Sequence, residues 1–242
     1  YARLERGNLT GVSDPVITAV SRALRLDQAE HDHLTALAAL ANDPSRTAAA
    51  RPADTVRPEL HTMLNAIVEA PALIRNRRMD LVAANALGWA LHDTMRGAPA
   101  HNNFARFIFC DPTARDFYAD WSLHADTTAA LLRRDSARSP HEPGIATLAA
   151  ELSAVTDEFA PRWNSHDVRR HYSGSKQYRH PVVGFLDLTY QTLEFEDDPG
   201  LVLTILTAEP GSVGAERLRL LRSWNETAPN DHSELRRAPT PT

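Results

Sequence analysis

Apolar residues follow a helical period in the segment that begins at Pro58. They recur at the spacing of one helix face, i, i+3, i+4, i+7 and i+8: Leu60, Met63, Leu64, Ile67 and Val68. Proline is favoured at the first position of a helix, because its missing N–H would have no partner there. The pattern therefore predicts an amphipathic helix that starts at Pro58 and carries one apolar face.

The pattern changes after Pro71 to short apolar runs. Residues 72–76 (ALIRN) and 79–85 (MDLVAAN) flank a polar turn and predict a hairpin, and residues 84–164 are mainly helical in pattern. Three runs rich in Val, Leu, Thr and Tyr then predict strands within residues 168–180, 182–195 and 201–208. We place turns at Ser173–Gly174 and at residues 196–200, and a closing helix at residues 212–224.

These elements predict an α+β fold for residues 57–224, with an antiparallel sheet of about five strands and flanking helices. Residues 43–56, rich in Pro, Asp and small side chains, are expected to be a linker. The polar, proline-containing residues 225–242 are expected to be a disordered tail.

Residues 1–42 contain helix-start and helix-end signals that predict short helices. The first is expected to end at Gly7, because glycine readily adopts the conformation that follows a helix. The second starts at Ser13 as an N-cap and has its apolar positions at helical spacing: Val16, Val20, Ala23 and Leu24. The third starts at Asp27, where Glu30 completes a capping box.

Composition narrows the function classes. The chain has 43% hydrophobic and 24% charged residues, as expected for a globular protein, and its net charge of −5 does not indicate nucleic-acid binding. Cys110 is the single cysteine, so no disulfide can form within the chain and a cytoplasmic location is favoured. No apolar run approaches the roughly 20 residues of a membrane span, and we expect no membrane partner.

The sequence gives little support to an enzyme or to a metal site. His166, His171 and His180 match no zinc-binding spacing, and hydrogen-bonded structural histidines are the simpler interpretation. Cys110 lacks a nucleophile signature, and no phosphate loop or cofactor fingerprint occurs. We therefore expect no enzyme activity, no cofactor and no metal.

The stretch YARLERGNLTGVSDPVITAVSRALRL at residues 1–26 resembles the end of the recognition helix and the following helices of Xre-type helix-turn-helix domains. The resemblance implies an all-α remnant of a DNA-binding domain in residues 1–42, with the chain beginning inside the recognition helix. It implies that Arg3 faces the major groove and that Arg6 and Asn8 contact phosphates. The full-length protein would then bind double-stranded DNA.

Later segments resemble the ligand-binding domain of MmyB-like transcription regulators, a PAS-related module. They include APALIRNRRMDLVAANALGWAL, NNFARFIFCDPTARDFYADW and DPGLVLTILTAEPGS. The resemblance implies a bacterial one-component regulator, a homodimer, that senses a small apolar, fatty-acid-like molecule in a pocket between sheet and helices. The aromatic and basic residues expected at that pocket are Phe107, Phe109, Tyr118, Trp121, Trp163, His166, Arg169 and His180. The alternative is a PAS-like dimerisation or protein-interaction module with a filled interior and no ligand.

Overall fold

The structure is a computed structural model that describes residues 14–24, 55–97, 100–139, 142–165 and 173–227. The chain divides into two compact units, Tyr1–Pro52 and Ala53–Thr242. In the first unit, helix α1 (Asp14–Leu24) buries Ile17 and Val20. Val16 and Leu24, two positions of the predicted apolar face, are exposed. The predicted helices at residues 1–7 and from Asp27, and residues 43–54 and 228–242, lie outside the described residues.

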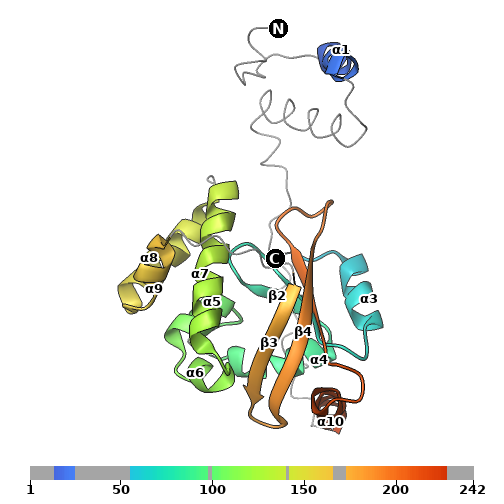
Figure 1. Cartoon of the computed structure of the whole chain (residues 1–242), viewed down its shortest axis with the longest axis vertical. Coiled ribbons are helices and arrows are strands. Elements are labelled where there is room, and N and C mark those ends of the chain that lie inside the picture. The colour runs from blue at the N-terminus through green and yellow to red at the C-terminus, as the bar shows by residue number, and fades with distance from the viewer. Residues whose placement is uncertain (1–13, 25–54, 98–99, 140–141, 166–172, 228–242) are drawn as a thin grey trace, which may run out of the picture. The chain divides into compact units, whose positions relative to one another are not determined.

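The second unit is built on one antiparallel sheet of five strands in the order β2-β1-β5-β4-β3 (Figure 1). The strands are β1 (Ala72–Arg75), β2 (Leu81–Ala84), β3 (Ser173–His180), β4 (Gly184–Glu194) and β5 (Val202–Thr207). Every pairing is antiparallel, and β5, the last of the described strands in sequence, joins the hairpin β1–β2 to the hairpin β3–β4. The predicted α+β class with about five strands is confirmed.

One predicted turn is wrong. Ser173 and Gly174 lie inside β3, where Gly174 pairs with Tyr190 of β4. A methyl group at Gly174 would lie 3.1 Å from Cε1 of Tyr190. Gly174 therefore gives room to the Tyr190 ring, a role that the sequence pattern does not distinguish from that of a turn glycine.

Helices surround the sheet. They are α3 (Pro58–Ala66), α4 (Ala86–Leu91), the 3₁₀ helix η2 (Asp93–Met95), α5 (Phe104–Cys110), α6 (Ala114–Phe117), α7 (Trp121–Arg138), α8 (Pro143–Val155), α9 (Phe159–Asn164) and α10 (Val213–Thr227). Side chains that accept a hydrogen bond from a backbone N–H fix three of the helix starts: Asn85 for α4, Asn103 for α5 and Asp120 for α7. Helix α10 runs three residues into the segment predicted as tail.

The predicted helix at Pro58 is present but ends earlier than its apolar face suggests. The chain leaves the helix at Ile67, whose φ of −87° and ψ of 95° are extended, and Val68 is 59% exposed. Asn85 holds this exit, because its Nδ2 donates to the carbonyl oxygens of Ile67 at 2.5 Å and Ala70 at 2.8 Å. Its Oδ1 also accepts from the Ala72 amide at 3.1 Å, so one buried side chain links α3, β1 and α4.

The two faces of the sheet are covered differently. Figure 1 shows α5 to α9 on one side of the strands and α3 on the other. Side chains alternate along each strand, so Leu73 and Arg75 of β1 face the α5–α9 side while Ile74 packs with Leu64 of α3. The same alternation brings Lys176 and Tyr178 of β3 to the α5–α9 side.

Candidate ligand-binding site

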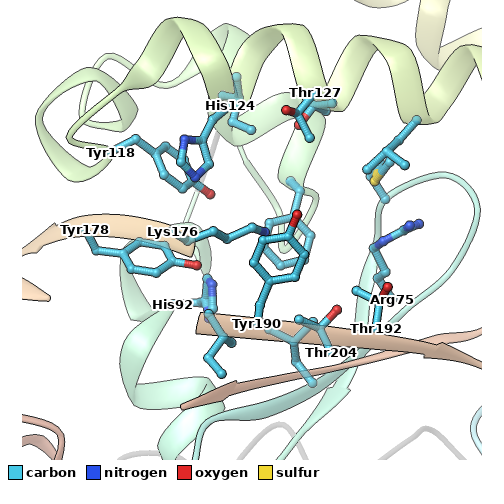
Figure 2. Close-up of a pocket in the computed structure, with 17 residues that line it drawn as sticks. Arg75, His92, Tyr118, His124, Thr127, Lys176, Tyr178, Tyr190, Thr192 and Thr204 are labelled. Carbon is cyan, nitrogen blue, oxygen red and sulfur yellow. The ribbon is translucent and has the colours of Figure 1, made fainter. Parts of the chain in front are cut away.

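A cavity of about 70 Å³ lies between the sheet and helices α5 and α7 (Figure 2). Strands β1, β3, β4 and β5 form its floor, and α7 with the segment before it forms its roof. Its lining combines six apolar side chains with eleven that carry cationic, imidazole, phenol or hydroxyl groups: Leu73, Arg75, Met79, His92, Phe104, Ile108, Tyr118, His124, Thr127, Thr128, Leu131, Lys176, Tyr178, Tyr190, Thr192, Thr204 and Leu206. Polar groups that converge on a cavity with aliphatic and aromatic walls are a feature of small-molecule sites.

Lys176 occupies the middle of the cavity and is the single lysine of the chain. Its Nζ lies 4.9 Å from the centroid of the Tyr190 ring, within range of a cation–π contact. Within the part of the chain that the structure describes, no carboxylate forms an ion pair with this ammonium group. The cavity thus contains a cation whose described neighbours do not neutralise it.

Desolvation sets the protonation of Lys176. Burial of the ammonium group, together with a smaller effect of the positive charge of Arg75, lowers the pKa of Lys176 to about 8. The side chain as a whole is half-buried.

Arg75 provides a second cation at one end of the cavity (Figure 2). Its guanidinium lies 3.7 Å from the Asp135 carboxylate of α7 and donates to the Asn76 carbonyl oxygen at 3.1 Å. Burial lowers the pKa of Arg75, and the charge of Asp135 opposes that effect. Unlike Lys176, this cation has an anionic partner within the protein.

Imidazole and phenol rings line the other end of the cavity, and three of them, His92, Tyr118 and Tyr178, carry no charge near neutral pH. Burial lowers the pKa of His92 to about 4, and His92 Nδ1 lies 3.0 Å from the Gly88 carbonyl oxygen as a donor. Burial raises the pKa of Tyr118 and of Tyr178 above the ordinary tyrosine value, so both phenols stay protonated. The His124 ring stacks on Tyr118 with centroids 4.1 Å apart. His92, Tyr118 and Tyr178 offer neutral polar contacts beside the Lys176 ammonium.

Comparison with known proteins relates this cavity to a function. Residues 56–221 match the family model of the MmyB-like transcription regulator ligand binding domain. The chain belongs to this family. The resemblance inferred from the sequence is confirmed for this region, and the domain is the ligand-sensing part of a transcription regulator. A search of curated proteins finds no match to the chain.

The family match begins at residue 56 and does not extend to residues 1–42. Arg3, Arg6 and Asn8, the predicted DNA contacts, lie outside the described residues. Among the described helices, none has both the length and the apolar character of a membrane span. The same described ranges contain no group of three His, Cys, Asp or Glu side chains that would hold a metal ion.

Tyr118 is the predicted ligand-binding residue that the structure places in the cavity lining. The other predicted aromatic residues have core partners. Phe107 packs edge-on against Phe117, with centroids 5.6 Å apart, and Phe109 packs edge-on against Phe159 at 5.0 Å. Both lie in the main hydrophobic core. The aromatic residues of this segment therefore divide between the hydrophobic core, where Phe107 and Phe109 lie, and the cavity wall, where Tyr118 lies.

The two predicted tryptophans also lie outside the cavity lining. Trp121 Nε1 donates to the Ile108 carbonyl oxygen at 2.9 Å, and the Arg115 guanidinium lies 3.7 Å from the Trp121 ring. Trp163 stacks on Phe159 with centroids 5.5 Å apart. Both side chains pack at the edge of the main core rather than against the cavity.

The three predicted basic residues have different positions. His180 is buried outside the lining, where its Nε2 lies 3.1 Å from the Ala90 carbonyl oxygen and its Nδ1 accepts from the Val182 amide at 3.2 Å. Because Nδ1 accepts, the proton is on Nε2 and donates to Ala90. This is a structural histidine by its contacts. His166 and Arg169 lie outside the described residues.

Sequence reasoning missed Lys176, Tyr178 and Tyr190. A signal was present, because β3 reads SGSKQYRH and alternation places Lys176, Tyr178 and His180 on one face. The predicted turn at Ser173–Gly174 hid this alternation. The rarity of lysine in the chain was a second signal, since an isolated lysine beside tyrosines on one strand face indicates more than a solvated surface charge.

Proposed function

We propose that the second unit senses a small carboxylic acid with an apolar tail, a fatty-acid-like ligand, and that the ligand binds in the cavity around Lys176. One observation carries the proposal. In the ligand-binding domain of a transcription regulator, an ammonium group without a described carboxylate partner points into an apolar-walled cavity.

The physical reason is the cost of an isolated charge. A desolvated ammonium group is unfavourable unless an anion or several acceptors compensate it. A ligand carboxylate would form a charge-assisted hydrogen bond with Lys176 and would raise the lysine pKa. The apolar part of the ligand would then contact the apolar lining: Leu73, Met79, Phe104, Ile108, Leu131 and Leu206. Each buried methylene adds about 0.8 kcal/mol.

The size of the cavity limits the ligand. Pockets for drug-sized molecules measure about 300–1,000 Å³, whereas this cavity measures about 70 Å³. The cavity as described fits a head group and a few carbons, and a long acyl chain requires lining side chains to move apart. Binding of such a chain would therefore change the packing of α7 on the sheet, which is how a ligand can favour one arrangement of a regulator.

Calorimetric titration with straight-chain carboxylic acids of increasing length tests this proposal. We expect affinity to rise with chain length to a limit set by the cavity, and to fall at least tenfold in Lys176→Met. Arg179→Met is the matched control, because Arg179 lies on the same strand with its side chain exposed. Equal affinity in wild type and Lys176→Met would contradict the assignment of Lys176 as the anchor.

We further propose that residues 1–42 belong to a helix-turn-helix domain and that the protein acts in the cytoplasm as a homodimer on a two-fold DNA operator. A mobility-shift titration tests this in a form with a complete helix-turn-helix domain. Arg3→Ala should cost about 1–3 kcal/mol at one base position if Arg3 contacts a base, and should weaken all sequences equally if it contacts phosphate. Arg6 and Asn8, as phosphate contacts, should follow the second pattern.

The alternative is an interaction module without a ligand, and the small volume of the cavity favours it. In that case the domain would dimerise, with the segment 58–70 among the contacts, and no carboxylic acid of any length would bind. Sedimentation with and without ligand separates the two functions. A dimer that forms equally in both conditions, with no heat of binding, would support the interaction module.

A further inference from the structure

We propose that Lys176 is also a covalent attachment site, whose amine forms a reversible imine with a short aldehyde that enters the cavity. This inference rests on the proposed function in one respect, because the aldehyde would enter by the same route as the carboxylic acid. It goes further, because it assigns a reaction to one atom of this chain and a second chemical class of ligand to the cavity.

The geometry leaves the reactive nitrogen available. Figure 2 shows the Lys176 side chain extended into the cavity between Tyr178 and Tyr190. The contact that the structure records for the ammonium is the face of the Tyr190 ring, 4.9 Å from Nζ to centroid. Within the described residues, no hydrogen bond and no ion pair holds this nitrogen. An incoming carbonyl carbon would therefore not have to displace a protein acceptor.

The protonation state makes the nitrogen nucleophilic. A lysine with a pKa of about 8 is neutral in roughly a fifth of molecules at pH 7.4, against about one in a thousand for an ordinary lysine. Desolvated lysines are the ones that proteins use for Schiff bases. The titratable and charged groups around it come from several elements: Arg75 of β1, His92 after α4, Tyr118 before α7, His124 of α7, Tyr178 of β3 and Tyr190 of β4.

None of these neighbours raises the pKa of Lys176 back towards its ordinary value. Arg75 is a cation, His92 is neutral near pH 7, and the phenols of Tyr118 and Tyr178 remain protonated. The phenols are suited to donate a hydrogen bond to a carbonyl oxygen rather than to restore a positive charge on Lys176.

The reaction balances without an oxidant or a reductant. The lone pair of Nζ attacks the aldehyde carbon, the C–N bond forms, and the electron pair of the C=O π bond moves to oxygen. Oxygen gains a proton and nitrogen loses one, which gives a carbinolamine. The hydroxyl group then takes up a proton and leaves as water while the nitrogen loses its remaining proton, and the nitrogen lone pair forms the C=N bond. Added water reverses each step, so attachment would report the aldehyde concentration.

Reductive trapping with butanal and cyanoborohydride tests the inference on the 242-residue chain, with adducts located by peptide mass mapping. The chain has one lysine, so its α-amino group is the other amine to be distinguished. We expect an adduct on Lys176, formed at pH 7.4 at least tenfold faster than on Nα-acetyl-lysine, with half-maximal rate near pH 8. Lys176→Arg should keep the charge and lose the adduct.

Three outcomes would overturn the inference: no adduct at all, modification confined to the N-terminal amine, or a Lys176 rate equal to that of Nα-acetyl-lysine. Thermal unfolding of Lys176→Arg checks that the variant is folded. Calorimetry with butyrate separates this result from the proposed function. Butyrate binding without an adduct would refute the imine and leave the proposed function standing, whereas an adduct without butyrate binding would support the imine and remove the carboxylate anchor.

Discussion

The guanidinium of Arg75 on β1 lies 3.7 Å from the carboxylate of Asp135 on α7, and this ion pair joins the sheet to the helix at one end of the cavity. Both side chains are largely buried, with exposed fractions of 10% for Arg75 and 4% for Asp135. Asp135 also pairs with Arg134 at 2.8 Å. Arg75 is poorly solvated and depends on Asp135 for its ion pair, whereas Asp135 also has Arg134.

We therefore predict that Asp135→Ala lowers the free energy of unfolding by about 3–5 kcal/mol, because it leaves the Arg75 charge buried without its partner. The double variant Arg75→Met, Asp135→Leu should recover most of that loss. Urea unfolding measures both. Asp126→Ala, which breaks a pair with Arg162 in which Asp126 is 42% exposed, is the control and should cost about 1 kcal/mol or less. Equal losses in Asp135→Ala and Asp126→Ala would refute the prediction.

Gly88 allows α4 to approach β1. A methyl group at this position would lie 2.6 Å from the Ala72 carbonyl oxygen and 3.0 Å from Asn85 Oδ1. Gly88→Ala should therefore destabilise the protein by about 2 kcal/mol, even though alanine is the better helix former by about 1 kcal/mol. Gly97→Ala is the matched control, since a methyl group there meets no atom within 4 Å. Equal stability of the two variants in thermal unfolding would show that the close approach of α4 to β1 does not require glycine at position 88.

His92 should make the protein sensitive to acid. Its pKa is about 4 in the folded protein, against about 6.5 when unfolded, so between these pH values the unfolded state binds more protons. The free energy of unfolding should fall as pH drops from 6.5 to 4, by as much as about 3 kcal/mol. His92→Phe should reduce this slope, and His180, whose pKa burial also lowers, should retain part of it. An unaltered slope in His92→Phe would show that the ring is protonated when folded.

Lys176 should make the free energy of unfolding depend on pH in the alkaline range. Its folded pKa of about 8 is below its unfolded value of about 10.4, so the unfolded state again binds more protons between these values. Stability of wild type relative to Lys176→Met should rise with pH in this window, by at most about 1.4 kcal/mol per pH unit. A comparison with Lys176→Met cancels the ionisation of buried tyrosines. A flat difference across the window would mean that the ammonium is fully solvated.

Much of the fold follows from local patterns. The hairpin of β1 and β2, the helical middle and the last two strands are confirmed, because alternation and helical spacing along each segment match the face that it buries. The cavity was harder to predict. Six rings between Phe104 and Trp121 suggested one wall, but the chain divides them among α5, α6, the segment after it and α7. Each ring then takes its own partner, and two of them, Phe104 and Tyr118, reach the cavity.

The interpretation of Gly174 as a turn residue explains why Lys176 was not predicted at the cavity. Gly174 is followed by SKQYRH and looks like a turn, yet its missing side chain admits the Tyr190 ring from the neighbouring strand. That requirement is a tertiary contact and leaves no trace in a sequence window. The polar end of the cavity was assigned to His166, Arg169 and His180, whereas the described cation in the middle of the cavity is Lys176.

The strand order has a consequence for synthesis of the protein. β5 stands between β1 and β4 in the sheet but is the last of the five described strands to leave the ribosome. Until Val202–Thr207 has been made, the hairpin β1–β2 and the hairpin β3–β4 have no strand to join them, and Thr204 and Leu206 are missing from the cavity. A nascent chain that has not yet reached β5 therefore has neither a joined sheet nor a complete cavity.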